Sequence, residues 1–340
     1  MNLISTASDP PPMNAHPTRR DFLKRAALLP LAVVAGLPAG RAFAAFAPIQ
    51  RVAGAHLKPA VNAYSFIELL TANAKDASKG IDLFGVCDFC AKHGCDAVDL
   101  TGYFFPGYPK APDDRYLIKL KRHAFDRGLA ISGTGVRNDF TTTDKAARDE
   151  GVQRIKTWIE VAAKLGAPAV RAFADSQPPF ENWQQAAANA SRETVETWMA
   201  DSLRECAEHG QKFGVIVAVQ NHCDFINTGA EHLSLLKRVD HEWCAALVDT
   251  GKYLTADPYA DIALVAPYAV NWQIKETMGS STDSPRTDMK RLVTIIRKSG
   301  YRGYLPIETL SMKRKGYDPL VEVATVLAEL REAIASTSNQ

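Results

Sequence analysis

From Lys58 onward, short apolar runs alternate with longer amphipathic stretches. A run of four to eight apolar residues between turn residues is typical of a strand that is buried on both faces. Such runs predict eight strands, at 60–66, 97–100, 130–136, 169–173, 215–221, 244–249, 269–275 and 304–308. Helical periodicity predicts eight helices, at 81–93, 114–127, 143–165, 191–213, 231–239, 258–265, 288–299 and 319–335. Several of these helices end at a glycine, which is a common helix stop.

Eight strands that alternate with eight helices predict an α/β fold, a (β/α)8 TIM barrel formed as a single domain by residues 45–340. The alternative is a doubly wound sheet, which usually has fewer strands and often a glycine-rich phosphate turn. The nearest candidate for that turn, Gly133-Thr-Gly135, lacks the third glycine of the motif. Two connections, 175–189 and 277–287, are longer than a barrel needs. We expect both to lie over the site, the second as a mobile lid.

The first 44 residues have a different pattern. Arg19-Arg20 precedes an apolar run from Ala26 to Leu37, and Ala42-Phe43-Ala44 follows as a small-x-small cleavage site. This is the layout of a signal peptide, and the paired arginines resemble the twin-arginine export signal. We therefore expect a periplasmic or secreted protein with no stable membrane anchor after cleavage. An uncleaved anchor is the alternative.

Composition narrows the classes of partner. The chain has 340 residues, of which 46% are hydrophobic and 23% are charged, as in a globular domain with an ample core. The formal net charge is only +2, so the sequence lacks the strongly basic character that nucleic-acid binding needs, and we expect no nucleic-acid partner. A homo-oligomer remains open.

Polar residues follow the last four predicted strands at their carboxyl ends, where TIM barrels place their chemistry. The residues at these ends are Gln220, Asn221 and His222, then Asp249, then Gln273 and Lys275, and finally Glu308. Four of them, Gln220, Asp249, Gln273 and Glu308, would offer side-chain oxygens to one cation. An all-oxygen set suits Mn²⁺ or Mg²⁺ better than zinc. The alternative is that the two carboxylates pair with Arg137, Arg171 or Lys275.

These strand ends resemble those of the xylose isomerase-like barrel family of sugar phosphate isomerases and epimerases. The resemblance covers about residues 60–330 and includes Asn62-Ala-Tyr-Ser-Phe66 and Lys164-Leu-Gly-Ala167. It implies a divalent metal bound by Glu, Asp, His and Glu at the ends of strands five to eight. Asp249 and Glu308 match this pattern, whereas Gln220 and Gln273 stand where the family normally has Glu and His. Asn221, His222 and Lys275 also match residues that are frequent in the family.

The resemblance implies a metal-dependent sugar isomerase/epimerase-like enzyme that abstracts a proton alpha to a carbonyl and stabilises an enediolate. The amide of Gln220 cannot accept a proton near neutral pH. Epimerisation with two bases would therefore need His222, Asp224 or Glu276 in its place. One-base chemistry needs only Glu308 or His222, with Lys275 and the metal stabilising the enolate. The alternatives are a metal-dependent lyase that cleaves 3-keto-glycosides and a non-catalytic periplasmic carbohydrate-binding barrel.

The substrate is expected to be a small carbohydrate bound at the same face of the barrel. The candidate substrate-binding residues are Tyr64, Phe66, Tyr103, Phe105, Arg137, Asn138, Arg171, Asn221 and Trp272. Aromatic faces can stack on a sugar ring, although packing in the core or a lid is nearly as good an explanation for each ring. The two arginines could bind phosphate, carboxylate or hydroxyl groups, or pair internally with Asp99, Asp139 or Asp175. An exported enzyme meets few sugar phosphates, which favours an unphosphorylated or oxidised sugar.

Overall fold

The computed structural model describes residues 46–340 except 280, 282, 311–313 and 339–340, so the predicted signal segment 1–44 lies outside the described residues. Eight parallel strands form one sheet in the order β7-β6-β5-β4-β3-β2-β1-β8. The strands are β1 His56–Asn62, β2 Ala97–Thr101, β3 Ala130–Gly135, β4 Ala169–Phe173, β5 Ile216–Gln220, β6 Cys244–Asp249, β7 Ala269–Gln273 and β8 Arg302–Ile307.

The sheet closes just past the end of β7. The backbone N–H of Ile274 donates to the carbonyl of Pro306 at 2.8 Å, and the N–H of Glu308 donates to the carbonyl of Ile274 at 2.9 Å. These two bonds join the edge strands, so the predicted (β/α)8 barrel is confirmed. The closure also fixes the backbone of Glu308 beside the chain that carries Lys275.

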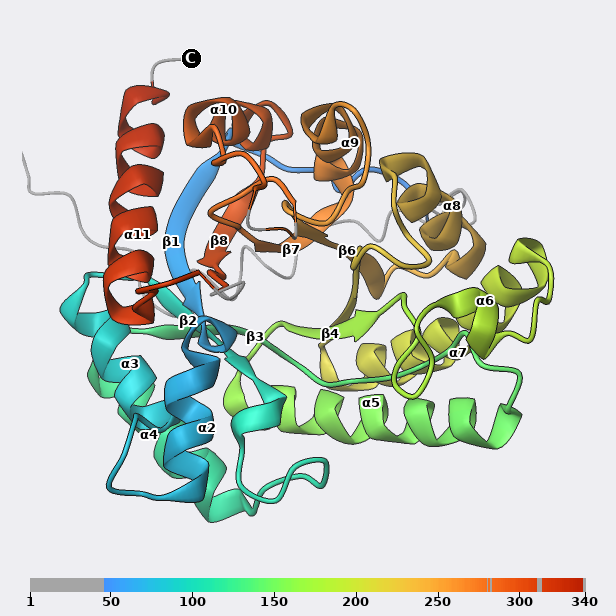
Figure 1. Ribbon diagram of the computed structural model, residues 1–340, viewed down its shortest axis with the longest axis horizontal. Helices are drawn as coiled ribbons and strands as arrows, with labels where there is room; N and C mark the ends of the chain where they lie inside the picture. Colours follow the sequence, from blue (N-terminus) through green and yellow to red (C-terminus); the bar gives the residue numbers. More distant parts are fainter. Residues whose placement is uncertain (1–45, 280, 282, 311–313, 339–340) are drawn as a thin grey trace, which may run out of the picture. The chain divides into compact units, whose positions relative to one another are not determined.

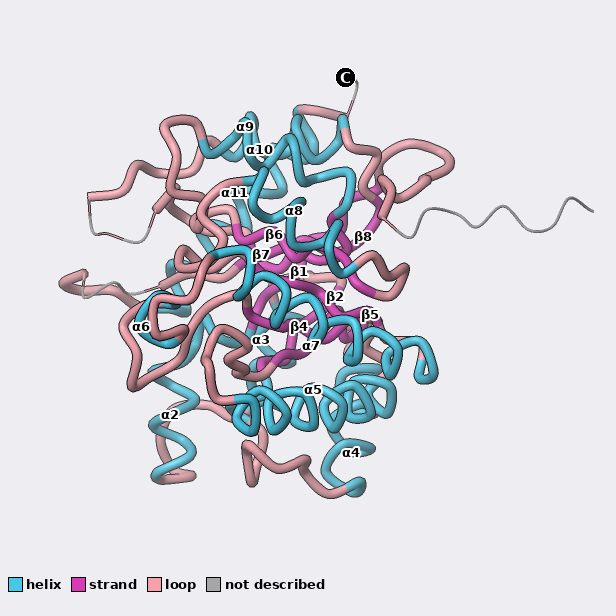
Figure 2. Tube along the Cα trace, turned by 90° about the vertical axis from the view of Figure 1, so that its right-hand side faces the viewer, coloured by secondary structure: helices cyan, strands magenta, loops and turns pink. Residues whose placement is uncertain are grey.

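Helices follow the strands and surround them, as Figures 1 and 2 show. They are α2 Ile67–Lys75, α3 Leu83–Lys92, α4 Asp114–Asp126, α5 Lys145–Leu165, α6 Trp183–Ala186, α7 Arg192–Phe213, α8 Gly229–Val239, α9 Pro258–Val265, α10 Met289–Lys298 and α11 Pro319–Ser336. Eight of these match the predicted helices to within a few residues. The other two, α2 and α6, lie in connections between the predicted strands and helices.

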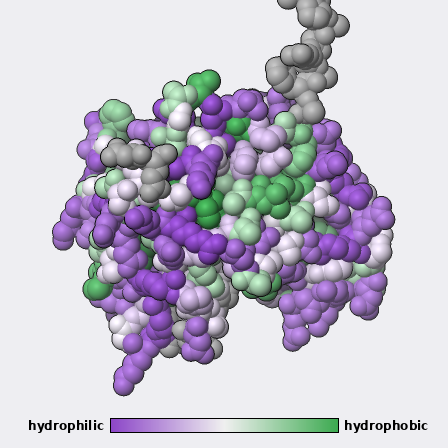
Figure 3. Space-filling model, turned by 90° about the horizontal axis from the view of Figure 1, so that it is seen from above, coloured by the Kyte–Doolittle hydropathy of each residue, from purple (hydrophilic) through white to green (hydrophobic). Residues whose placement is uncertain are grey.

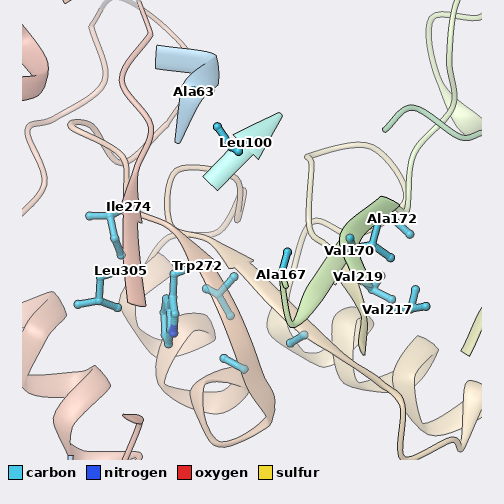
Figure 4. Packing of buried hydrophobic residues seen from close by; sticks show 14 of the residues in the cluster. Ala63, Leu100, Ala167, Val170, Ala172, Val217, Val219, Trp272, Ile274 and Leu305 are labelled. Atoms are coloured by element: carbon cyan, nitrogen blue, oxygen red, sulfur yellow. The ribbon is translucent and has the colours of Figure 1, made fainter. Parts of the chain in front are cut away.

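The alternation of side chains along each strand divides the buried residues into two clusters. The larger cluster fills the space between the strands and the helices, and Figure 4 shows part of it, including Val170 of β4, Val217 of β5 and Trp272 of β7. A smaller cluster contains Ala169, Ala218 and Leu247. The residues two positions later, Arg171, Gln220 and Asp249, are polar and point to the same side of the sheet. The small cluster therefore forms an apolar floor beneath a ring of polar side chains inside the barrel, which we call the polar ring.

Two glycines on β3 make room for this polar ring. A methyl group on Gly133 would lie 2.5 Å from Oδ2 of Asp99, and one on Gly135 would lie 2.7 Å from Cβ of Arg171. Both glycines belong to strand β3, whose pairing with β2 shifts register just before Gly133, so Gly133-Thr-Gly135 is not a phosphate turn. Their lack of a side chain lets two larger polar residues of neighbouring strands occupy the barrel interior.

The surface seen in Figure 3 is largely hydrophilic, with an apolar area near the middle of the face. Among the residues that the structure describes, no helix is both long and apolar enough to span a bilayer.

Gly135→Ala is expected to lower the free energy of unfolding by about 1–3 kcal/mol, because the new methyl group must displace the side chain of Arg171. Thr134→Val is the matched control on the same strand. The hydroxyl of Thr134 is buried and has no hydrogen-bond partner among the described residues, so its removal is expected to be neutral or stabilising. Chemical denaturation of both variants checks this, and an unaffected Gly135→Ala variant would contradict the packing argument.

Candidate active site

The four predicted oxygen donors meet at the carboxyl end of the barrel. The amide nitrogen of Gln220, at the end of β5, donates to Oδ2 of Asp249 at 2.8 Å and to Oε1 of Gln273 at 2.6 Å. Glu308 joins the group through Lys275, whose ammonium contacts both Glu308 and Asp249. All five side chains are buried. Residues from four strand ends therefore converge as the sequence predicted.

Lys275 lies at the centre of this group. Its Nζ is 3.5 Å from Oδ2 of Asp249 and makes a close ion pair with Oε1 of Glu308. Burial by itself would lower the pKa of Lys275, but the carboxylates of Asp249 and Glu308 outweigh burial and raise it above its usual value. Burial raises the pKa of Asp249, and the ammonium opposes that rise. Lys275 is therefore a fixed cation at neutral pH.

A divalent metal at this end of the barrel would need several of these side chains as ligands. In the part of the chain that the structure describes, no three His, Cys, Asp or Glu side chains are grouped closely enough to hold one. Oδ2 of Asp249, Oε1 of Gln273 and Oε1 of Glu308 already accept hydrogen bonds from nitrogen donors. A metal would have to displace the ammonium and turn the Gln220 amide around. The donor set as arranged does not fit a divalent metal, and we derive no step through one.

His222 forms a hydrogen-bonded pair with Asp175, a residue that the sequence analysis did not select as a functional one. Nδ1 of His222 lies 2.7 Å from Oδ2 of Asp175, which follows β4. The carboxylate is buried, whereas the imidazole side chain is 34% exposed, and its ring lies 4.8 Å from that of Phe173. No described residue bonds to Nε2. Asp175 therefore orients the imidazole and leaves its second nitrogen open at the barrel mouth.

Arg171, on β4, and Tyr103 lie next to this dyad, because Arg171 and His222 both contact the Phe173 ring. Arg171 is buried, donates to the hydroxyl of Tyr103 and lies over the Phe173 ring, with 4.2 Å between Cζ and the ring centroid. Burial raises the pKa of Tyr103 to about 12, so its hydroxyl stays protonated at neutral pH. A cationic group held between two aromatic rings is a suitable partner for oxygen atoms of a polar ligand.

A cavity of about 810 Å³ lies next to Tyr103, between α2 and the connections that follow β2 and β3. Four of the predicted substrate-binding residues line it, namely Tyr64, Tyr103, Phe105 and Arg137. The guanidinium of Arg137 also lies over the Tyr103 ring, at 5.1 Å from its centroid. Tyr103 therefore borders both the polar ring and an aromatic-lined space.

A second buried polar cluster lies on β1, β2 and β7. Asp99 accepts from the amide nitrogen of Asn62 at 3.1 Å and from that of Asn271 at 2.9 Å. Burial raises the pKa of Asp99 to about 6, against the opposing effects of the Asn271 bond and of Arg171. Sequence reasoning missed this cluster as a unit, because Asn62 and Asn271 are separated by 209 positions and only barrel closure brings them together.

Two predicted substrate-binding residues serve the backbone instead. Asn221 accepts from the N–H of Asp249 at 2.8 Å and donates to its carbonyl at 2.9 Å. Asn138 bonds to both backbone groups of Phe173 in the same way. Each amide is fully buried and holds the end of a neighbouring strand, so its polar atoms are not directed at a ligand.

Two of the residues considered as substitute bases are also occupied by structural contacts. The carboxylate of Asp224 accepts from the N–H groups of Ser176 and Trp183, which ties the β4 connection to the β5 connection. Glu276 accepts from the N–H of Leu310 at 2.8 Å and from Arg314 at 3.0 Å. His222, whose side chain is 34% exposed, is the candidate substitute with a nitrogen that bonds to no described residue.

The structure places two predicted aromatic contacts in the core, which corrects their assignment. Phe66 is fully buried and packs on Phe89, with 4.9 Å between ring centroids. Trp272 is fully buried and packs on Tyr301, with 5.7 Å between centroids. Trp272 lies between inward-facing Asn271 and Gln273 on β7, so the strand alternation turns it toward the helices. The pattern of strand ends predicted where Phe66 and Trp272 lie, but not the direction in which their side chains point.

No curated protein matches the chain, but several solved structures do. A 3-keto-D-glucoside 4-epimerase from E. coli superposes with a TM-score of 0.62 at 15% identity, over 81% of this chain and 99% of that one. A D-psicose 3-epimerase, solved in the presence of D-fructose, has a TM-score of 0.63 at 17% identity, over 82% and 98%. The IolI protein with a bound zinc atom gives 0.62 at 16% identity, over 82% and 97%.

At these identities the likeness is one of fold. The chain spans only 43% of another match, a fusion protein of a xylose isomerase-like TIM barrel with 4-hydroxyphenylpyruvate dioxygenase. The family described as xylose isomerase-like TIM barrel matches residues 87–334, which is more than half of the chain. Together with the closed barrel and its polar carboxyl end, this match shows that the chain belongs to the xylose isomerase-like TIM barrel family.

Proposed function

We propose that this protein is a sugar isomerase/epimerase-like enzyme that abstracts a proton alpha to the carbonyl of a small carbohydrate. The observation that carries the proposal is the presence, at the same end of the barrel, of an imidazole oriented by Asp175 and of a buried ammonium held by Glu308. The similar structures include two sugar epimerases, which supports a carbohydrate as the substrate. The divalent metal of the sequence prediction is not part of the proposal, because the donor set does not fit it.

His222 is the proposed base. Glu308, the other sequence candidate, has one carboxylate oxygen in a close ion pair with the ammonium of Lys275, so that this oxygen already has a partner. Nε2 of His222 would take the proton from carbon, while the electron pair of that bond moves to the carbonyl oxygen. Nδ1 is bonded to Asp175, which favours the imidazolium that forms.

Lys275 is the proposed stabiliser of the resulting oxyanion. An ammonium has three N–H bonds, and two of them face Asp249 and Glu308. The third remains for the substrate oxygen. A fixed positive charge in a buried site stabilises a developing negative charge more strongly than it would in water. Return of the proton from His222 to the former carbonyl carbon, with transfer of the enediolate's hydroxyl proton from one oxygen to the other, gives aldose–ketose isomerisation with a single base at carbon.

Arg171, Tyr103 and the aromatic-lined cavity are proposed to orient the substrate. Arg171 would bind sugar oxygens, and the rings of Tyr64 and Tyr103, with centroids 6.1 Å apart, would border a second part of the ligand. A carbohydrate longer than one ring, or a sugar with an attached group, would reach from the polar ring into this cavity of about 810 Å³.

Exchange of solvent deuterium into carbon tests the reaction. We expect incubation of a panel of unphosphorylated aldoses, ketoses and 3-keto-glucosides in D₂O to give deuterium at a carbon next to the carbonyl, measured by NMR. His222→Gln is expected to lower this rate by about 10²- to 10⁴-fold, because the amide cannot accept the proton. A fully active variant would exclude His222 as the base. Release of an aglycone would instead support the lyase, and ligand-induced stabilisation without exchange or cleavage would support a binding protein.

Asp175→Asn tests the positioning of His222. We expect kcat to fall by about 10- to 100-fold, equivalent to the 1.5–3 kcal/mol of a charge-assisted hydrogen bond, while KM and the melting temperature change little. Asp88→Asn is the matched control, because Asp88 also bonds to a histidine, His123, at 2.9 Å, but on the outer helices. Equal effects of the two substitutions on turnover would argue against a catalytic dyad.

We also propose that the protein is exported, on the basis of residues 1–44 alone. Replacement of both Arg19 and Arg20 by lysine is expected to retain the protein inside a bacterium that has twin-arginine export, since that pathway requires the arginine pair. Fractionation of cells checks the location, and unchanged export of the double variant would contradict a twin-arginine signal.

A further inference from the structure

We propose that the ammonium of Lys275 occupies the position of a divalent cation in this barrel, and that the protein works without a bound metal. Four oxygen-bearing side chains converge at the carboxyl end, as they would around an ion. The group at their centre is the Lys275 ammonium, which contacts the carboxylates that follow β6 and β8. Its side chain is 4% exposed, so the charge is as internal as a bound metal would be.

The structure holds the lysine by several contacts besides the ion pairs. Its backbone N–H donates to the hydroxyl of Thr250 at 2.9 Å, and its carbonyl accepts from the hydroxyl of Thr287 at 2.8 Å. A methyl group on Gly251 would lie 2.9 Å from Cγ of Lys275, so that glycine leaves space for the aliphatic part of the side chain. These contacts fix the lysine in the ring.

Gln220 places its amide nitrogen between two of the oxygens, while its own Oε1 is buried and has no hydrogen-bond partner among the described residues. Its amide nitrogen faces Oδ2 of Asp249 and Oε1 of Gln273. The opposite orientation would place an oxygen against those two oxygens, with no proton between them, so the partners fix the amide direction. Nitrogen donors thus occupy the space between oxygens where a metal would need to bind.

The charges favour the same conclusion. Asp249 and Glu308 supply two negative charges, and Lys275 neutralises one of them. A divalent ion bound beside the ammonium would be repelled by its like charge. The two carboxylates are too few to offset both this repulsion and the loss of water from the ion. Zinc would also lack the nitrogen and sulfur ligands that it prefers.

In the proposed function this ammonium is the cation that stabilises the oxyanion. The inference depends on the proposed function only for this stabilising role of the ammonium. Whether an ammonium or a metal occupies the ring does not depend on whether the protein turns over a substrate. Metal content and metal binding can therefore be measured without knowledge of the substrate.

The test compares the full wild-type chain with variants designed to accept a metal. Gln220→Glu with Gln273→His supplies a carboxylate and an imidazole but keeps Lys275, and a triple variant adds Lys275→Gln. Each protein is produced with Mn²⁺ and Zn²⁺ present, dialysed, and measured by elemental analysis and by the shift of its melting temperature with added Mn²⁺.

We expect the wild type to retain less than about 0.1 metal per chain and to melt at the same temperature with Mn²⁺ or with EDTA. The triple variant is expected to bind about one metal per chain and to melt higher with Mn²⁺, while the double variant binds far more weakly. A wild type that holds about one metal per chain, or that melts lower after EDTA, would overturn the proposal. A triple variant that folds but binds no more metal than the wild type would also count against it, because the ammonium and the amides would then not be what excludes the metal.

Lys275→Met provides a further check on the wild-type framework. Without the ammonium, two buried carboxylates face each other with nothing to neutralise them. We expect this variant to melt lower than the wild type and to lose deuterium exchange, whereas Lys58→Met on β1, whose lysine contacts the Tyr304 ring outside the ring of strand ends, should keep both. Unchanged melting of Lys275→Met would show that the ammonium does not balance the two carboxylates. If exchange is undetectable even in the wild type, the proposed function fails, while the metal measurements still decide this inference.

Discussion

The buried ion pairs between one ammonium and two carboxylates are the interaction on which the candidate site depends. Asp249 and Glu308 end strands that are not neighbours in the sheet, with β7 between them, and Lys275 comes from the chain just past β7. An isolated carboxylate would be costly to bury at either place. The lysine therefore makes it possible for both acids to face the barrel interior and so permits a charged ring above the apolar floor of Ala169, Ala218 and Leu247.

Most of the fold was predictable because its strands are apolar runs that differ clearly from the amphipathic helices. The predicted limits of β4, β6 and α9 are those of the structure. The first βα unit was less accurate. Strand β1 is His56–Asn62, four residues earlier than predicted, because Lys58 and Pro59 interrupt the apolar pattern although both take part in pairing with β8. Helix α2 was missed because Leu70 is the one residue of that helix that is buried, so its periodicity is weak.

The positions of the site residues in the barrel were predictable, but the directions in which their side chains point were only partly so. The rule that chemistry lies at the carboxyl ends of barrel strands located Gln220, Asp249 and Glu308, because parallel strands end at one rim. It could not tell that the Trp272 side chain turns outward or that Asn221 binds backbone groups, since both depend on register. The sequence suggested Asp175 only as an ion-pair partner for arginine. Its actual partner, His222, follows the next strand, and that pairing becomes evident only when β4 and β5 lie side by side.

The two glutamines and the lysine are best understood as one change in the charge of the ring. With the family pattern of three acidic ligands, one imidazole, a divalent metal and the lysine that is frequent there, the ring would be neutral. Here two acidic residues and one ammonium leave one net negative charge. The two glutamines carry no charge, and the Gln220 amide donates to Asp249 and Gln273. The replacement of an acidic and an imidazole ligand by amides leaves the lysine as the cation that contacts the two remaining acids.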